Sequence, residues 1–191
     1  MDGYQIITDS NTDFSPALAQ ELGVVIIPME FTLSGASYLQ YPDERDLSNK
    51  SFYERIAAGE TTTTNQINAA TFIETFERYL QAGIDVLYIG FSSGLSGTFN
   101  GSRLVAQDLS QKYPDRRILA VDSLAASMGE GLLVYHAVMQ QRAGRTIDEV
   151  ASWVETNRNR LAHWFTVDDL NFLKRGGRVS GAAALFGTML G

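Results

Sequence analysis

The sequence has 191 residues, of which 45% are hydrophobic, so it can bury the core of one domain, or of one domain and part of a second. Its formal net charge of −7 argues against a nucleic-acid-binding protein, because such proteins carry a basic surface. The absence of cysteine excludes disulfides, thiolate metal sites and cysteine nucleophiles, and it agrees with the cytoplasmic location that we expect.

Four short apolar runs predict β-strands. They lie at residues 4–8, 24–31, 86–91 and 118–121. Continuous apolar runs of this length are typical of strands that are covered on both faces, as in parallel sheets. The first run begins directly after the N-terminus, which shows no signal-peptide pattern. No run reaches the ~18 apolar residues that a membrane span needs.

Three helices are marked by the residues at their ends. Ser15, Asn68 and Thr146 have the side chains that accept hydrogen bonds from the first turn of a helix. Gly23 and Gly83 follow the apolar pattern of the first two helices and are expected to end them.

The alternation of strands and helices predicts an α/β fold, with an open, mostly parallel sheet, right-handed crossovers and helices on both faces. Residues 34–50 are polar and without a period, and we expect a long loop there with a short edge strand. In such sheets ligands bind beyond the carboxyl ends of the strands. The candidate binding loops therefore follow the strands, at residues 9–13, 92–97 and 122–127, together with the threonine run at 61–66.

The first of these loops contains Asp9 and Ser10. An aspartate after the first strand is the nucleophile of haloacid-dehalogenase-type phosphatases, which need a second acid two residues later. Asn11 occupies that position and cannot act as an acid, which weakens the phosphatase hypothesis. Two other interpretations remain: these side chains hydrogen-bond the neighbouring backbone, or they line a pocket.

The threonine run and the loop after the third strand are uncharged and rich in hydrogen-bond donors. Residues 61–66 either end a β-branched strand or place hydroxyls at the start of a helix, where they could bind an anion. Residues 92–98, SSGLSGT, lack the lysine of a P-loop and the pattern of a nucleophile elbow. Only two histidines, His136 and His163, are available for a catalytic triad. The loop is therefore either a tight turn before a helix or a binding loop.

The densest basic patch lies at residues 173–181, where Lys174, Arg175 and Arg178 surround a Gly-Gly turn. It is either a solvated turn or a place where cations meet an acidic partner or the head group of a ligand. No group of His, Asp and Glu has the spacing of metal ligands, so we expect no metal.

Five stretches taken together resemble the DegV family of bacterial fatty-acid-binding proteins. They are IITDSNTDFS, TTTTNQIN, IGFSSGLSGTFNGS, VDSLAASMGEGLLV and VDDLNFLKRGGRVSG, in the family's order over nearly the whole chain. The resemblance implies a two-domain α/β protein that holds one long-chain fatty acid, such as palmitate, with no cofactor and no catalysis of its own. It also implies a carrier role, in which the protein presents the fatty acid to a separate fatty acid kinase subunit that makes acyl phosphate.

The resemblance further implies which residues bind the carboxylate of the fatty acid. These are the hydroxyls of Thr64 and Ser96, with Thr63 and Ser93 as close neighbours. We expect the first two at the starts of helices beside one sheet edge, with their hydroxyl oxygens within ~6 Å of each other, about twice a hydrogen-bond length. The candidates for further pocket or partner contacts are Asp9, Ser10, Gly97 and Arg178.

The chain departs from the family in two places. Asn65 stands where the family has a serine, and the chain ends where family members continue into a second domain. The expected domains are residues 1–160 and the beginning of a second α/β domain at 161–191. In the latter we expect a strand at 163–167, a helix at 169–174 and an apolar stretch at 182–190. Exposed apolar surface of this kind favours a homodimer, and transient membrane contact is a further expectation.

Two other functions stay open beside the lipid carrier. One is a small-molecule hydrolase or phosphatase that uses Asp9. The other is a regulatory domain whose ligand is only structural. Co-purified lipid, turnover of a phosphate ester, or neither, would distinguish the three.

Overall fold

The computed structural model describes residues 3–164, 166 and 170–178, and the chain divides into two compact units, Met1–Leu161 and Ala162–Gly191. The first unit contains two sheets. In the second unit the described part contains α7 (Leu170–Arg175) and a turn at residues 176–177, which confirms the expected helix and turn where they are described. The expected strand at 163–167 is wrong at residues 163, 164 and 166, which have no regular structure; residues 165, 167 and the apolar stretch 182–190 lie outside the described residues.

The larger sheet has four parallel strands in the order β2-β1-β6-β7. These strands are β1 (Tyr4–Asp9), β2 (Val25–Ile27), β6 (Asp85–Gly90) and β7 (Ile118–Asp122). The register pairs Ile7 with Tyr88 and Tyr88 with Ala120. The predicted α/β class with a parallel sheet is confirmed.

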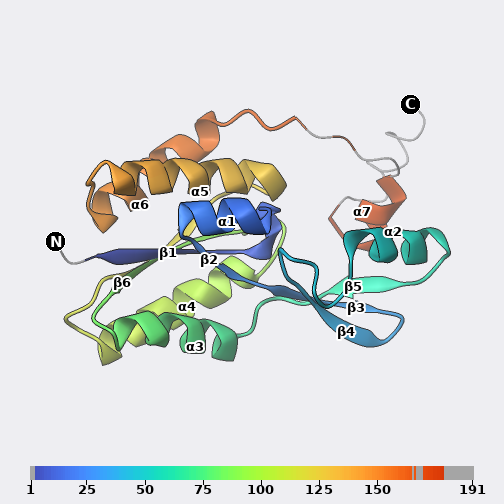
Figure 1. Cartoon of the computed structure of the whole chain (residues 1–191), viewed down its shortest axis with the longest axis horizontal. Coiled ribbons are helices and arrows are strands. Elements are labelled where there is room, and N and C mark those ends of the chain that lie inside the picture. Colours follow the sequence, from blue (N-terminus) through green and yellow to red (C-terminus); the bar gives the residue numbers. More distant parts are fainter. Residues whose placement is uncertain (1–2, 165, 167–169, 179–191) are drawn as a thin grey trace. The chain divides into compact units, whose positions relative to one another are not determined.

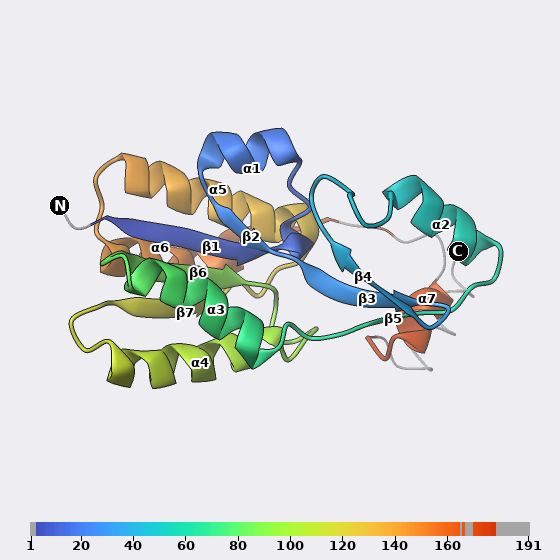
Figure 2. The ribbon, with the colours of Figure 1, turned by 60° about the horizontal axis from the view of Figure 1, so that its bottom comes forward.

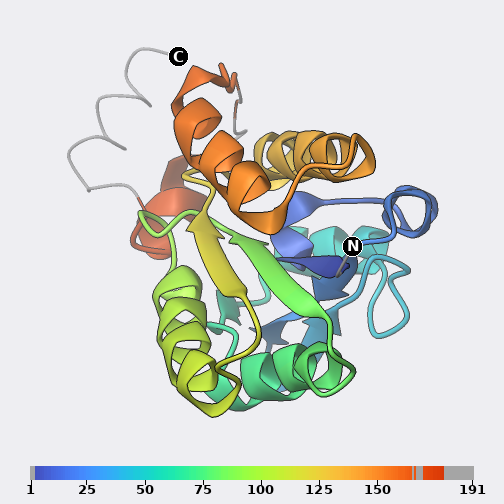
Figure 3. The same ribbon diagram turned by 90° about the vertical axis from the view of Figure 1, so that its left-hand side faces the viewer.

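Helices cover both faces of this sheet (Figures 1 and 3). One face carries Ile6, Leu87 and Ile89, which pack with α1 (Pro16–Leu22), α5 (Ser127–Arg142) and α6 (Ile147–Asn157). The other face carries Ile7 and Tyr88, which pack with α3 (Ala69–Leu80) and α4 (Thr98–Lys112). Neighbouring residues of a strand point to opposite faces, so both faces need apolar side chains, and the runs are continuous.

The predicted helix starts are confirmed by their hydrogen bonds. Ser15 accepts from the N–H of Leu18, and Asn68 accepts from the N–H of Thr71. Thr146 and the third residue of α6 form the reciprocal bonds of a capping box. Because these bonds join residues that are close in the chain, the sequence alone suffices to predict them.

The smaller sheet is antiparallel, in the order β4-β3-β5, and extends from the end of β2 (Figure 2). Its strands are β3 (Met29–Leu33), β4 (Ala36–Gln40) and β5 (Thr62–Thr64). The prediction of one strand over 24–31 is wrong. Pro28 has no N–H to donate to a ladder, so it separates the part of the run in the parallel sheet from the part in the antiparallel sheet.

The expected short edge strand within residues 34–50 is confirmed as β4. The sequence pattern did not predict α2 (Asn49–Ala57), which has no fully buried residue. Three aromatic rings link this helix to the smaller sheet: Phe31 stacks on Tyr38 with ring centres 5.5 Å apart, and meets Phe52 edge-on at 5.1 Å. Ring contacts of this kind stabilise the packing of a helix that buries little else.

Candidate functional site

The order of the parallel strands creates a switch point between β1 and β6. From β1 the chain crosses to β2 on one side, and it later returns to β6 on the other side. In open α/β sheets the crevice beyond the carboxyl ends of two such strands is the usual place for a ligand. Two of the candidate loops, at residues 9–13 and 92–97, begin there.

Asp9, the last residue of β1, is fully buried and accepts four hydrogen bonds. Its Oδ2 accepts from the Tyr88 hydroxyl at 2.7 Å and from the N–H of Phe91 at 3.1 Å. Its Oδ1 accepts from the N–H and the side-chain amide of Asn11, at 3.0 and 2.6 Å. Both oxygens are occupied, so Asp9 fastens the β1 loop to the end of β6, which agrees with the loop-shaping interpretation.

Glu130, in the first turn of α5, is a second fully buried acid that the sequence analysis did not single out. Burial, with the negative charge of Asp9 nearby, raises its pKa well above the usual value. Burial and Asp9 also raise the pKa of Tyr88 far above that of an ordinary tyrosine. The sequence feature that could have identified Glu130 is its place as an acid within an otherwise apolar segment at the start of a helix.

The loop after β6 is built around Ser92. Its carbonyl accepts from the N–H groups of Leu95 and Ser96, and its hydroxyl accepts from the N–H of Gly94 at 3.2 Å. These bonds make the tight turn that was predicted, which ends two residues before α4, but Gly97 at the N-cap position has no side chain that could cap the helix. Ligand binding by this loop stays a prediction. The side chain of Ser93 stands exposed on the outside of this turn.

The third candidate loop, at 122–127, supports this turn. Oδ1 of Asp122 accepts from the N–H of Ser93 at 3.1 Å and from the N–H of Leu124 at 3.0 Å. The carbonyl of Asp122 accepts from Nη1 of Arg158 at 2.7 Å. Asp122 therefore fixes the backbone of Ser93 through Oδ1, and its carbonyl ties the loop to Arg158.

The threonine run forms β5, and α3 begins only at Ala69. The prediction that Thr64 stands at the start of a helix is therefore wrong, and the strand interpretation is confirmed. Thr63 pairs with Thr32, and their hydroxyls are 2.6 Å apart. Thr64 pairs with Phe31 and so lies on the opposite face of the smaller sheet from Thr63.

The threonine run (residues 61–66) and the loop after β6 (residues 92–97, the Ser/Gly loop) meet at the start of α4, although they are about thirty residues apart in the chain. The N–H of Ile67 donates to Oγ1 of Thr98 at 3.4 Å, and that oxygen lies 3.0 Å from Oγ of Ser96. Beside this link, a Cβ on Gly97 would lie 2.7 Å from Cδ of Gln66. The sequence analysis did not single out Thr98, whose signal was its place two residues after Ser96. The distance between the hydroxyls of Thr64 and Ser96 stays a prediction.

The remaining candidates lie elsewhere. Ser10 accepts from the N–H of Met29 at 3.0 Å, and it lines a cavity of about 260 Å³ together with Gln40 and Tyr53. Arg178 belongs to the second unit, where its Nη1 donates to the carbonyl of Gly176 across the Gly-Gly turn. Their roles as pocket or partner contacts stay predictions.

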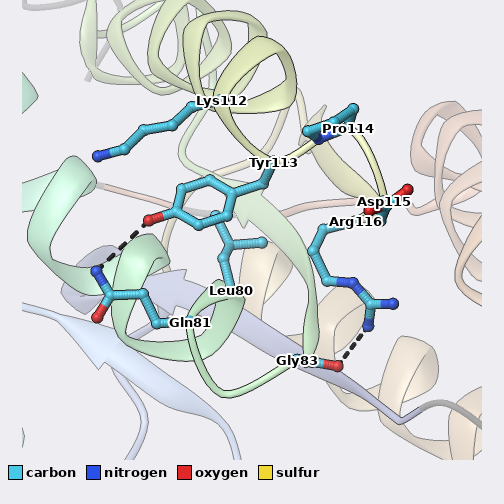
Figure 4. A pocket seen from close by; sticks show the side chains of 8 residues that line it. All are labelled: Leu80, Gln81, Gly83, Lys112, Tyr113, Pro114, Asp115 and Arg116. Carbon is cyan, nitrogen blue, oxygen red and sulfur yellow. Dashed lines mark hydrogen bonds between the residues drawn. The ribbon is translucent and has the colours of Figure 1, made fainter.

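A larger groove of about 490 Å³ lies at the other end of the parallel sheet, before the amino ends of β6 and β7 (Figure 4). Two polar side chains of its lining hydrogen-bond to other groups of the lining. The Gln81 amide donates to the Tyr113 hydroxyl at 3.4 Å, and Arg116 donates to the carbonyl of Gly83 (Figure 4). Part of the polar lining of this groove is therefore already paired.

Two features of the described part of the chain bear on the class of site. Among those residues no three His, Asp or Glu side chains are grouped so that they could hold a metal ion. None of the helices described is both long enough and apolar enough to cross a bilayer.

Comparisons with a family model and with curated proteins point to the same family. A family model described as an uncharacterised protein of the DegV family matches residues 4–191. A DegV domain-containing protein of Clostridium perfringens is 42% identical over 190 residues, which are 100% of this chain and 65% of that protein. One of Lactococcus lactis is 40% identical over 187 residues, 97% of this chain and 64% of that protein. The chain therefore spans about 65% of the length of these curated relatives.

Solved structures share the fold. A DegV family protein from Thermus thermophilus, described by its fatty acid binding, is 32% identical with a TM-score of 0.84; the match covers 98% of this chain and 65% of that one. A protein from Thermotoga maritima, described as having a fatty acid binding function, is 26% identical with a TM-score of 0.78; the match covers 94% of this chain and 64% of that one.

Proposed function

The chain belongs to the DegV family, and on this basis we propose that it binds a long-chain fatty acid. The carboxylate is held at the carboxyl edge of the parallel sheet by hydroxyls of the β5 strand and of the Ser/Gly loop. The observation that carries the proposal is the link from Ile67 through Thr98 to Ser96, which brings the segment that follows β5 to the Ser/Gly loop. The relatives described as fatty-acid-binding proteins support the choice of ligand.

The hydroxyls at this edge suit a carboxylate. Those of Thr64 and Ser93 are exposed and make no hydrogen bond to any group in the described part of the chain. Ser96 precedes α4, a helix of 15 residues whose N-terminus favours an anion. Thr63 is engaged with Thr32, so within the threonine run Thr64 is the stronger candidate. Neutral donors hold an anion without a tight ion pair, which leaves its oxygens reactive.

The acyl chain supplies most of the affinity in this proposal. Burial of each methylene contributes about 0.8 kcal/mol, so a chain of ~15 such groups contributes ~12 kcal/mol before the costs of association. Each charge-assisted hydrogen bond to the carboxylate adds about 1.5–3 kcal/mol. The carboxylate contacts therefore serve mainly to fix the position of the head group.

We further propose that the protein is a carrier and not an enzyme, and that it presents the bound fatty acid to a separate ATP-dependent fatty acid kinase. Asp9 supports this assignment, since both of its oxygens already accept two hydrogen bonds each and it has no exposed surface. A nucleophile needs a free oxygen that a substrate can reach.

Calorimetric titration of the chain with palmitate tests the proposal. We expect binding by the wild-type chain, and a loss of affinity of about ten-fold or more in Thr64→Val and in Ser96→Ala, because each removes one charge-assisted hydrogen bond. Ser110→Ala is the matched control: this hydroxyl donates within α4 to the carbonyl of Ala106, and its removal should leave the affinity unchanged. Absence of palmitate binding by the wild-type chain would overturn the proposal.

A further inference from the structure

Thr98 is the first residue of α4, and its side chain is completely buried. Its hydroxyl oxygen lies 3.4 Å from the backbone nitrogen of Ile67 and 3.0 Å from Oγ of Ser96. Its own N–H lies 3.2 Å from the same Ser96 oxygen. Thr98 thus contacts the segment that follows β5, at Ile67, and the Ser/Gly loop, at Ser96, while its own side chain stays buried.

The direction of these hydrogen bonds follows from counting protons. An N–H can only donate, so Thr98 accepts from Ile67. Ser96 is the other partner that the described residues offer to the Thr98 hydroxyl. If Thr98 did not donate to Ser96, its proton would be buried without a partner, which is a costly and rare arrangement. Thr98 is therefore the donor in this pair.

The direction of this bond determines what the Ser96 hydroxyl can do. Its oxygen accepts from the hydroxyl of Thr98 and from the N–H of Thr98, and these two bonds occupy both of its lone pairs. The proton of Ser96 is left to point away from the helix, so Ser96 can act only as a donor. A donor of fixed direction favours a ligand group that only accepts, and an anionic acceptor most of all.

We propose that Thr98 is the positioning residue of the carboxylate site, which holds the Ser96 hydroxyl as an obligate donor and so selects fatty acids over their neutral esters. This inference rests on the proposed function and adds to it a residue that does not touch the ligand. Thr98→Val keeps the shape of the side chain, removes the proton that orients Ser96, and frees the Ser96 hydroxyl to rotate.

The test compares palmitate with methyl palmitate in calorimetric titrations. We expect Thr98→Val to weaken palmitate binding by about three- to ten-fold and methyl palmitate by less than about two-fold, since hydrogen bonds to charged groups are the stronger ones. Thr98→Ser keeps the hydroxyl and should restore the wild-type ratio. Ser102→Ala is the matched control, because this buried hydroxyl of α4 donates to the carbonyl of Phe99 and should not change the ratio.

A double-mutant cycle separates positioning from loss of structure. In a Ser96→Ala background Thr98→Val should weaken palmitate binding no further, because the residue through which it acts is gone. The inference would be overturned if Thr98→Val lowered the affinities for palmitate and methyl palmitate equally, or if its effect on palmitate affinity added fully to that of Ser96→Ala. In either case the proposed function would still be upheld by palmitate binding to the wild-type chain. A wild-type chain that binds neither ligand overturns both. If Thr98→Val does not fold, Thr98→Ala gives the same comparison, with urea unfolding as the check of its fold.

Discussion

The side chain of Gln66 lies against the backbone of Gly97, so closely that a Cβ on the glycine would fall 2.7 Å from Cδ of the glutamine. Gln66 follows β5, and Gly97 ends the loop after β6. The contact therefore brings together two stretches that local sequence patterns treat as unrelated. It also makes Gly97 a sensitive position for testing how the candidate site is assembled.

Gly97→Ala should impair the site without unfolding the protein. The backbone φ of Gly97 is −75°, which alanine adopts freely, and Gln66 is exposed, so its amide can swing away. We expect the free energy of unfolding to change by less than about 1 kcal/mol, while palmitate affinity falls several-fold. Gly94→Ala in the same loop is the control, because its Cβ would lie 3.5 Å from the Ser92 hydroxyl, an ordinary contact. Equal affinities of the two variants would contradict this prediction.

Asp9→Asn should destabilise the fold. The amide offers one acceptor oxygen where the carboxylate offers two, and its NH₂ group faces donors. We expect a loss of about 2–4 kcal/mol in urea unfolding, because buried donors lose charge-assisted bonds. Tyr88→Phe, which removes one of the four donors, should cost less. A folded Asp9→Asn protein of wild-type stability would show that the network does not hold the β1 loop.

Glu130→Gln should change how stability depends on pH. Thr8 has one hydroxyl proton, and its oxygen lies 2.8 Å from the carbonyl of Ile89 and 3.2 Å from Oε1 of Glu130. If that proton goes to the carbonyl, which can only accept, Glu130 must itself donate to Thr8 and so be neutral. Burial and the charges of Asp9 and Asp122 favour the same neutral form, and its pKa is raised well above 4.5.

The sign of the pH effect follows from that direction. The folded state keeps the proton of Glu130, whereas the unfolded chain releases it near pH 4.5. The stability that the neutral form contributes is therefore complete below about pH 4.5, and it is lost as pH rises toward the raised pKa, by up to about 1.4 kcal/mol per pH unit. Glu130→Gln lacks this loss. The free energy of unfolding of the variant, relative to that of the wild type in urea unfolding, should therefore be higher at pH 8 than at pH 5. An equal difference at both pH values would contradict a neutral Glu130.

Gly131→Ala and Gly101→Ala should have opposite effects, although both lie inside helices. A Cβ at Gly131 would lie 2.7 Å from the ring of Phe14 and 3.0 Å from the carbonyl of Thr12. Phe14 is buried and cannot move aside, so we expect a loss of about 1–3 kcal/mol. At Gly101 the nearest atom would be 4.0 Å away, and the better helix former should stabilise by about 0.5–1 kcal/mol. Thermal unfolding of both variants measures the contrast.

Two of the wrong predictions, the single strand at 24–31 and the helix start at Thr64, concern strand pairing. The run at 24–31 looks continuous, but Pro28 divides it between β2, which pairs with β1, and β3, which pairs with β4 and β5. Thr64 was expected at the start of a helix, whereas its pairing with Phe31 makes it part of a strand. Pairing with other strands decided both cases, and a local pattern does not specify the partner strand.

The sequence by itself determined the parts of this protein that depend on near neighbours. Caps such as Ser15 and Asn68 and the turn at Ser92 arise from bonds within a few residues, and strands that are covered on both faces appear in the sequence as continuous apolar runs. Only the tertiary structure decided that the Ile67 backbone meets Thr98, and that Glu130 is enclosed among acids. The directions of these hydrogen bonds and the state of these protons depend on groups that the folded chain brings together from thirty or more residues away, and no local pattern encodes them.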